Sequence, residues 1–259
     1  MELRPYQNEA NDRIQEEWAS GVKKTLLVLP TGLGKTVTFS DLTKQLVSKG
    51  ERVLIMAHRG ELLDQAADKL FKVTGLKSAV EKADQTAKNS FYSVTVGSVQ
   101  TLMREKRLQD FPQDYYDTII VDEAHHILAS SYQKVLEYFS EAKVLGVTAT
   151  ADRTDKKNLG EFFESLAYEY TLPDAIKNKY LSPMKAMTIP LKIDLSGVSM
   201  SAGDFKASEV GSALDPYLYQ IADEMVKNCS NRKTVVFLPL VATSKKFRDI
   251  LNEKGFKAA

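Results

Sequence analysis

Short apolar runs that alternate with amphipathic stretches constrain the fold of this chain most strongly. Runs of mainly β-branched and aliphatic residues have the length of a strand and lie at residues 25–29, 52–57, 93–96, 117–121 and 143–147. Three stretches between or after these runs carry apolar side chains at helical spacing, at residues 35–46, 61–71 and 132–139. Such a pattern is typical of a parallel sheet covered by helices on both faces. We therefore expect a doubly wound α/β domain in the first part of the chain.

The last third of the chain has a different pattern. Prolines interrupt residues 173–205, and a helix is predicted over residues 215–228. A further apolar strand at 234–238 and a helix at 243–254 then follow. One strand and one helix cannot form an independent sheet. The pattern predicts the opening of a second α/β unit that is incomplete within this chain.

Composition excludes some functions and leaves others open. The 259 residues include 35 Lys and Arg against 34 Asp and Glu, so a net charge of +1 gives no bulk attraction for nucleic acid. Cys229 is the single cysteine, which excludes an internal disulfide framework and disfavours a structural zinc site. The polar N-terminus and the strand-sized apolar runs predict an intracellular, cytoplasmic location without a membrane span.

The segment after the first predicted strand has the features of a phosphate-binding loop. Its glycines let successive backbone N–H groups face one point, and the next helix adds its positive end. Lys35 can then reach the β- and γ-phosphates of ATP, and the Thr36 hydroxyl can bind Mg²⁺. Leu29 stands where the strict pattern has glycine, and an ordinary glycine-rich turn is the alternative. The predicted ATP-binding residues of this loop are Pro30, Thr31, Gly32, Leu33, Gly34, Lys35 and Thr36.

An acidic pair, Asp122 and Glu123, follows the fourth predicted strand. The carboxyl ends of parallel strands form one ligand-binding edge, so the pair is expected in the same crevice as the phosphate loop. Asp122 is predicted to hold Mg²⁺ with Thr36, and Glu123 to orient or deprotonate the attacking water. The alternative is an acid pair that caps a helix. Together with the phosphate loop, the pair favours ATP hydrolysis, with Lys35, Asp122 and Glu123 as catalytic residues.

These motifs together resemble a superfamily 2 helicase of the DEAH-box type, because residues 122–125 read Asp-Glu-Ala-His and residues 148–150 read Thr-Ala-Thr. That superfamily often lacks the first glycine of the loop. Residues 3–7, Leu-Arg-Pro-Tyr-Gln, look like its adenine-sensing Q motif. The resemblance implies that Gln7 reads the adenine edge in a pocket shaped by Arg4 and Tyr6. It is closest to RadD-like repair helicases and the motor subunits of restriction enzymes.

The resemblance also implies contacts with nucleic acid and a route that couples them to ATP. Arg59, Ser98 and Thr101 would contact the phosphate backbone of one strand, without reading sequence. Thr148 and Thr150 would link the ATP site to the nucleic acid, and His125 would relay the nucleotide state. Outside the family context, Arg59 is a solvated arginine at a helix start, and the two threonines cap a strand end.

Residues 235–238 resemble motif IV, the first strand of a second RecA-like domain. The predicted organisation is a RecA-like ATP-binding domain at 1–172, a linker at 173–205 and the start of a second RecA-like domain at 206–259. In this family ATP lies between two such domains, and the second supplies an arginine finger. We expect the remaining half in cis in a longer protein, and little ATPase and no strand separation from these residues alone.

The predicted function is an ATP-dependent helicase or translocase that uses ATP and Mg²⁺. DNA is the expected partner rather than RNA, which rests on analogy with the family. Two alternatives stay open. One is a non-catalytic module that binds nucleotide and nucleic acid, and the other is a phosphate-loop ATPase or kinase of another superfamily.

Overall fold

The computed structural model describes residues 2–57, 60–150, 159–188, 193–201 and 204–259. Its contacts divide the chain into two compact units, Met1–Pro183 and Met184–Ala259. No helix in the described ranges combines the length and the apolarity needed to cross a lipid bilayer.

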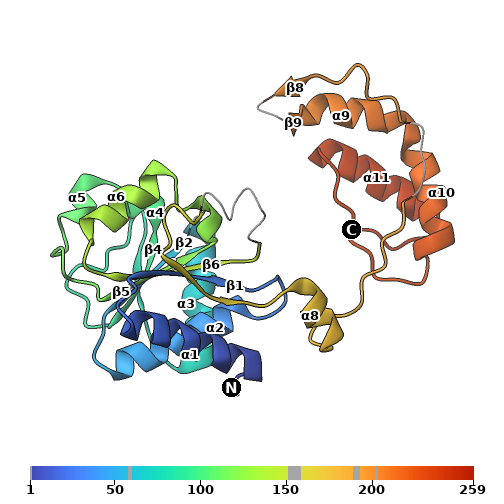
Figure 1. Ribbon diagram of the computed structural model, residues 1–259. Coiled ribbons are helices and arrows are strands. Elements are labelled where there is room, and N and C mark those ends of the chain that lie inside the picture. The colour runs from blue at the N-terminus through green and yellow to red at the C-terminus, as the bar shows by residue number, and fades with distance from the viewer. Residues whose placement is uncertain (1, 58–59, 151–158, 189–192, 202–203) are drawn as a thin grey trace. The chain divides into compact units, whose positions relative to one another are not determined.

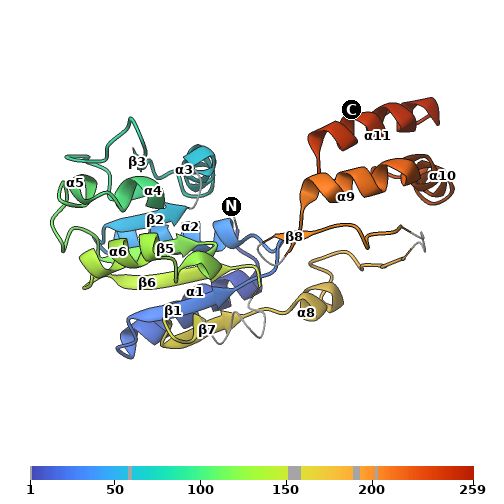
Figure 2. The same ribbon diagram turned by 90° about the horizontal axis from the view of Figure 1, so that it is seen from above.

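The first unit is built on a seven-stranded sheet in which every strand pair is parallel. The strand order is β3-β4-β2-β5-β6-β1-β7, and Figure 2 shows β2, β5, β6, β1 and β7 following one another in that order. The strands are β1 Lys24–Val28, β2 Val53–Ala57, β3 Ala79–Glu81, β4 Val94–Ser98, β5 Thr118–Asp122, β6 Lys143–Thr148 and β7 Ser165–Glu169.

Helices cover both faces of this sheet. Successive residues of a strand point to opposite faces, and in the central strands both sets are apolar and buried, so each face needs a covering layer. Leu27 and Ile55 pack in a core with α1, α2 and α3, whereas Leu26 and Leu54 pack in a second core with α4, α5 and α6. Figure 1 shows α1 and α2 on one side of the sheet and α4 and α6 on the other. The helices of this unit are α1 Pro5–Ala19, α2 Lys35–Ser48, α3 Gly60–Thr74, α4 Val99–Leu102, α5 Glu105–Leu108, η1 Ala124–His126, α6 Ser130–Tyr138 and α8 Leu172–Lys177.

This architecture confirms the predicted doubly wound α/β fold. The five predicted strands correspond to β1, β2, β4, β5 and β6, each with its expected polarity in a parallel sheet. The two edge strands, β3 and β7, were not predicted. β3 has only three residues, and β7 alternates half-buried with exposed side chains, so neither shows a continuous apolar run.

The second unit is mostly helical. It contains β8 Met200–Ser201, β9 Asp204–Phe205, α9 Ala207–Leu214, η2 Asp215–Tyr217, α10 Leu218–Cys229 and α11 Val241–Glu253. Its small core joins α10 to α11 through residues such as Leu218, Met225 and Phe247. Helices were predicted close to α10 and α11, but the strand predicted over residues 234–238 is wrong. In the described part of this unit that stretch has no neighbouring strand to pair with, and backbone groups need such a partner to form a sheet.

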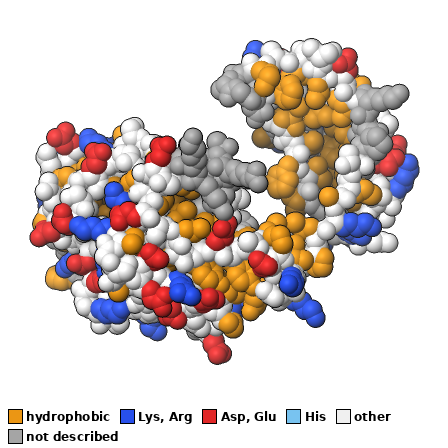
Figure 3. All heavy atoms as spheres, viewed as in Figure 1, with side chains coloured by type: hydrophobic (Ala, Val, Ile, Leu, Met, Phe, Trp, Pro, Cys, Tyr) orange, Lys and Arg blue, Asp and Glu red, His pale blue; other side chains and the backbone are white. Residues whose placement is uncertain are grey.

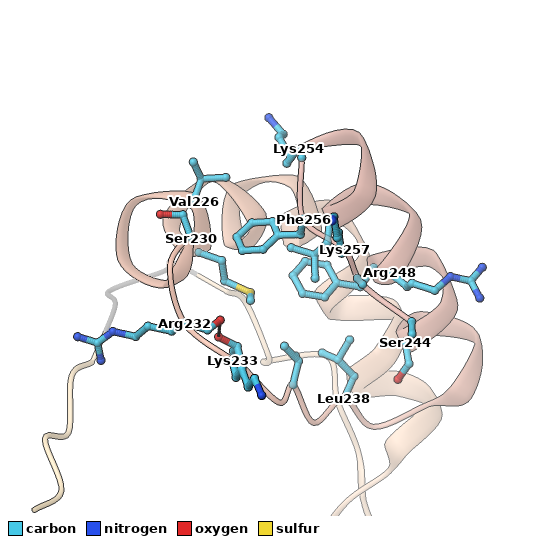
Figure 4. Close-up of a pocket in the computed structure, with 18 residues that line it drawn as sticks. Val226, Ser230, Arg232, Lys233, Leu238, Ser244, Arg248, Lys254, Phe256 and Lys257 are labelled. Carbon is cyan, nitrogen blue, oxygen red and sulfur yellow. Dashed lines mark hydrogen bonds between the residues drawn. The ribbon is translucent and has the colours of Figure 1, made fainter.

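Residues 234–238, which pair with no strand, expose apolar side chains to solvent and border a hollow. Val235 and Phe237 are 77% and 90% exposed. Figure 4 shows the hollow, which measures about 800 Å³ and is bordered by Leu238, Phe256 and residues of α10 and α11. Figure 3 shows hydrophobic side chains gathered on the visible face of this unit. The stretch has the composition of a strand but is not part of a sheet.

Candidate nucleotide-binding site

The phosphate loop joins β1 to α2 at the carboxyl edge of the sheet. Gly32 and Gly34 have φ angles of 89° and 77°, a left-handed conformation that glycine adopts without a steric penalty. Gly34 is also the N-cap of α2, so the following N–H groups lie at a helix N-terminus. The Lys35 ammonium donates to the carbonyl oxygen of Leu29 at 3.4 Å. Leu29 is fully buried, which explains why an apolar residue occupies this position.

The acidic pair lies at the same edge, one strand away from the loop. Asp122 ends β5, and β6 separates β5 from β1 in the sheet. Adjacent strands lie about 4.8 Å apart, so the two strand ends are separated by roughly 10 Å. Glu123 has a φ of 54°, and its backbone N–H donates to Asp122 Oδ1 at 3.0 Å. A non-glycine residue with positive φ is strained, and such residues cluster at functional sites.

The pKa of Asp122 responds both to the second acid and to the lysine of the phosphate loop. Burial raises the pKa of the Asp122 carboxyl, the negative charge of Glu123 raises it further, and Lys35 opposes this rise. A partly buried carboxylate beside a second acid favours a nearby cation. Among the described residues, no group of three or more His, Cys, Asp and Glu side chains is arranged to hold a metal ion. One carboxylate and one hydroxyl, from Asp122 and Thr36, fit Mg²⁺, which keeps several waters and binds substrate phosphates.

Hydrogen bonds join the start of α1 to the phosphate loop. Tyr6 donates its hydroxyl to the carbonyl of Leu33 at 2.8 Å, and Gln7 Nε2 donates to the same oxygen at 3.1 Å. Gln7 Oε1 accepts the backbone N–H of Arg4 at 2.9 Å, and the Gln7 side chain is buried. A methyl group on Gly34 would lie 2.8 Å from Gln7 Nε2, so this close packing requires glycine. The predicted adenine-sensing residues therefore lie beside the predicted phosphate-binding residues.

Sequence reasoning missed an aromatic cluster beside these residues. Tyr6 packs against Tyr170 and Tyr180, with ring centroids 4.9 and 4.8 Å apart. A methyl group on Gly32 would lie only 2.9 Å from a methyl of Leu181, so the segment after α8 touches the phosphate loop. These residues fall within or next to the predicted linker at 173–205. Their aromatic composition was the available signal, but irregular spacing gave no reason to place them at the site.

The predicted coupling residues surround the acid pair. Thr148 ends β6, is fully buried, and its hydroxyl donates to the carbonyl of Thr150 at 2.9 Å. The carbonyl of Thr148 accepts the N–H of Leu29, so β6 is bonded directly to the start of the phosphate loop. His125 Nδ1 lies 3.4 Å from a carboxylate oxygen of Glu123. The coupling role of these residues stays a prediction.

Two of the three predicted nucleic-acid contacts lie within the described residues, and both are buried. Arg59 lies outside the described residues. Ser98 and Thr101 are buried, and Ser98 Oγ lies 2.7 Å from Gln100 Oε1. The Thr101 hydroxyl accepts the backbone N–H of Ala83 at 3.1 Å, which ties α4 to the segment after β3. In this structure the two hydroxyl groups serve local packing, and their contact with nucleic acid stays a prediction.

A family model described as "Type III restriction enzyme, res subunit" matches residues 1–153, which include the phosphate loop, the acid pair and Thr148 to Thr150. The chain belongs to this family. The predicted superfamily 2 helicase motor is thereby confirmed at the level of family.

The proteins similar in sequence to this chain include a protein named as a putative helicase. The chain is 34% identical over 227 residues to the putative ATP-dependent helicase IRC3 of Saccharomyces cerevisiae, covering 82% of this chain and 33% of that protein. It is 29% identical over 229 residues to the Type I restriction enzyme EcoAI endonuclease subunit of Escherichia coli, covering 85% and 28%. The chain thus spans about a third of the length of these relatives.

The Hef helicase domain of Pyrococcus furiosus has a similar fold. It superimposes with a TM-score of 0.57 at 19% identity, covering 98% of this family member and 54% of that chain. At this identity the likeness shows the fold alone, and it agrees with the doubly wound sheet described above.

Proposed function

We propose that the chain is the nucleotide-binding part of an ATP-dependent DNA translocase or helicase. One observation carries this proposal: the phosphate loop and the Asp122–Glu123 pair lie at the same edge of a parallel sheet, with β6 between their strands. Ligands bind at this edge in sheets of this type. The family membership of residues 1–153 supports the same function.

Each residue then has a distinct role. Backbone N–H groups at residues 32–36 cradle the phosphates, and Lys35 stabilises the charge of the β- and γ-phosphates. Thr36 and Asp122 would hold Mg²⁺, which neutralises negative charge on the phosphates when it is bound. Glu123 orients the attacking water and accepts its proton. The products are ADP and phosphate.

Partners and location follow from the same proposal. DNA is the proposed nucleic acid along which the motor moves, because the matching family and the E. coli relative are both described as restriction enzymes. Arg59, Ser98 and Thr101 are the proposed backbone contacts, and the other half of the motor is supplied by a longer form of the chain. The proposed location is the cytoplasm, where ATP and DNA are both present.

Binding of a fluorescent ATP analogue, mant-ATP, with Mg²⁺ tests the site directly. Lys35→Ala removes the ammonium that meets the phosphates, and we expect its affinity to fall at least tenfold, since bonds to charged groups are among the stronger ones. Lys44→Ala is the matched control, because Lys44 is an exposed lysine on the same helix. Equal affinity of the Lys35→Ala and Lys44→Ala variants would contradict the proposal.

Turnover separates a motor from a module that only binds. ATP hydrolysis by a longer form of the chain should rise when DNA is added, and Glu123→Gln should abolish the rise while mant-ATP still binds. A wild-type protein that binds mant-ATP but never hydrolyses ATP, with or without DNA, would support the non-catalytic module instead.

A further inference from the structure

Tyr180 lies far along the chain from the Q motif and contacts it directly. The guanidinium carbon of Arg4 lies 5.5 Å from the centre of the Tyr180 ring, within the range of a cation–π contact. The Tyr180 ring also meets the Tyr6 ring edge-on at 4.8 Å. Tyr6 in turn bonds to Leu33 of the phosphate loop. Tyr180 is therefore joined to the nucleotide site through Arg4 and Tyr6.

The backbone fixes Tyr180 in this place. Tyr180 donates its N–H to the carbonyl of Ala175 at 2.9 Å, and Lys179 donates to Ile176 at 3.0 Å. These two bonds form the Schellman motif that ends α8. Lys179 has a φ of 60°, a conformation that glycine usually supplies. The turn directs Tyr180 onto Arg4 and Tyr6, and it directs Leu181 onto the phosphate loop, where Leu181 lies against Gly32.

The Q-motif glutamine is already engaged in this structure. Both ends of the Gln7 amide make bonds within the protein, and its side chain is only 4% exposed. Arg4 in contrast is exposed, with its guanidinium carbon over the Tyr180 ring. Arg4 Nη1 also donates to the Tyr6 hydroxyl at 3.4 Å. Nucleic-acid bases stack on guanidinium planes as they do on aromatic rings. The exposed guanidinium of Arg4 therefore offers a flat surface that a base can use beside the phosphate loop.

We propose that Tyr180 is a positioning residue that holds Arg4 as a stacking platform for the adenine of the bound nucleotide. A lone exposed arginine samples many rotamers, so it provides a fixed plane only when a second group holds it. Tyr180 holds it from the side away from the base. This inference rests on the proposed nucleotide site and adds a base-recognition element outside the Q motif.

The test uses Tyr180→Leu, which keeps the apolar packing against Ala175 and Tyr6 but removes the aromatic face. Tyr180→Phe keeps the face and loses only the hydroxyl. Tyr92→Leu is the control, since Tyr92 is a half-exposed tyrosine that precedes β4 at the opposite edge of the sheet. Each variant is titrated with mant-ATP and Mg²⁺, and competition is measured with ATP, with GTP and with inorganic tripolyphosphate, which has no base.

We expect Tyr180→Leu to weaken ATP binding about three- to tenfold, the scale of a cation–π contact. Tripolyphosphate affinity should be unchanged, and Tyr180→Phe and Tyr92→Leu should match the wild type. Arg4→Ala should weaken ATP binding by a similar factor, and the Arg4→Ala, Tyr180→Leu double variant should lose no more than Arg4→Ala alone.

Two results would overturn the inference. Unchanged ATP affinity in Tyr180→Leu is one, and an equal loss of ATP and tripolyphosphate affinity is the other, because it would mean that Tyr180 only supports the phosphate loop. A wild-type protein that binds neither ATP nor tripolyphosphate would instead contradict the nucleotide site itself. The two failures are therefore distinguishable in one set of titrations.

Discussion

Among single residues, Asp122 combines a functional position with an unfavourable environment. Burial and then the charge of Glu123 raise the pKa of its carboxyl above the ordinary value of 3.8. Between the ordinary pKa of the unfolded chain and the raised pKa of the folded chain, the folded chain binds more protons than the unfolded chain. The free energy of unfolding therefore falls as pH rises through that window. The whole penalty is present above the raised pKa, where the folded state holds the ionised carboxylate.

Asp122→Asn removes this charge while keeping the shape of the side chain. We expect the free energy of unfolding at pH 7 to rise by about 1 kcal/mol, the usual scale for relieving a functional site, while Mg²⁺-dependent ATP binding weakens. Urea unfolding at pH 7 and at pH 3 measures the gain, which should shrink at low pH.

Asp110→Asn is the control, because the pKa of Asp110 is shifted in the opposite direction from that of Asp122. The pKa of Asp110 is lowered, first by its hydrogen bond with Lys88, so this half-buried carboxylate is favoured in the folded state. Its removal should not raise stability at pH 7. A gain in Asp110→Asn equal to that in Asp122→Asn would mean that the burial of Asp122 is not the cause.

Much of the candidate site could be predicted from local residue patterns. Asp122 and Glu123 lie at the end of a strand, and Lys35 and Thr36 follow the glycine-rich turn after another strand. Their position in the chain fixes which edge of a parallel sheet they share. Tyr180 could not be predicted in the same way. Its contact with Arg4 depends on a turn at Lys179 and on packing between distant segments, and neither leaves a periodic pattern.

At the scale of elements, the strands with continuous apolar runs were predictable because both of their faces are buried. The edge strands β3 and β7 were not predicted, because one side of each has no neighbouring strand and tolerates polar residues. Residues 234–238 gave the opposite error. Their composition favours a strand, but composition does not supply the partner strand that a sheet needs.

Central strand β6 contains a glycine whose role is steric. An added methyl group on Gly146 would overlap the ring of Phe163, which is buried against this face of the sheet. We expect Gly146→Ala to lower the free energy of unfolding by about 2 kcal/mol through overpacking. Phe163→Leu in the same chain should recover part of this loss, so the two changes will not be additive in urea unfolding.

Gly197→Ala is the matched control for this prediction. Apart from its two chain neighbours, no atom of the described residues lies within 4 Å of an added methyl group there, and its effect should stay within about 0.5 kcal/mol. Additive effects of Gly146→Ala and Phe163→Leu would show that the ring is not what excludes a side chain from β6.

At the scale of the whole molecule, each compact unit has its own core. The sheet cores belong to Met1–Pro183, and the small helical core joins α10 to α11 in Met184–Ala259. The candidate nucleotide site lies entirely within the first unit. A ligand that binds only the folded form of one unit should stabilise that unit alone.

Calorimetry of the full chain should therefore show two unfolding transitions, of which Mg-ATP moves one. At a free concentration of 100 times its Kd, ATP adds about 2.7 kcal/mol to the unit that binds it. At the same ATP concentration the Lys35→Ala variant should keep both transitions but show at most about half of this stabilisation, because its affinity is at least tenfold lower. A single transition, or a shift of both, would contradict independent stability of the two units.

The unpaired stretch at residues 234–238 has a practical consequence for work with this chain. A short run of β-branched and aromatic residues without charge or proline is the signature of amyloid-like association. Arg232 and Lys233 before it and Pro239 after it are gatekeepers of the kind that natural sequences place beside such runs. Self-association in concentrated solution should therefore begin at this stretch, and solubility can be improved by a charged substitution there without touching the nucleotide site.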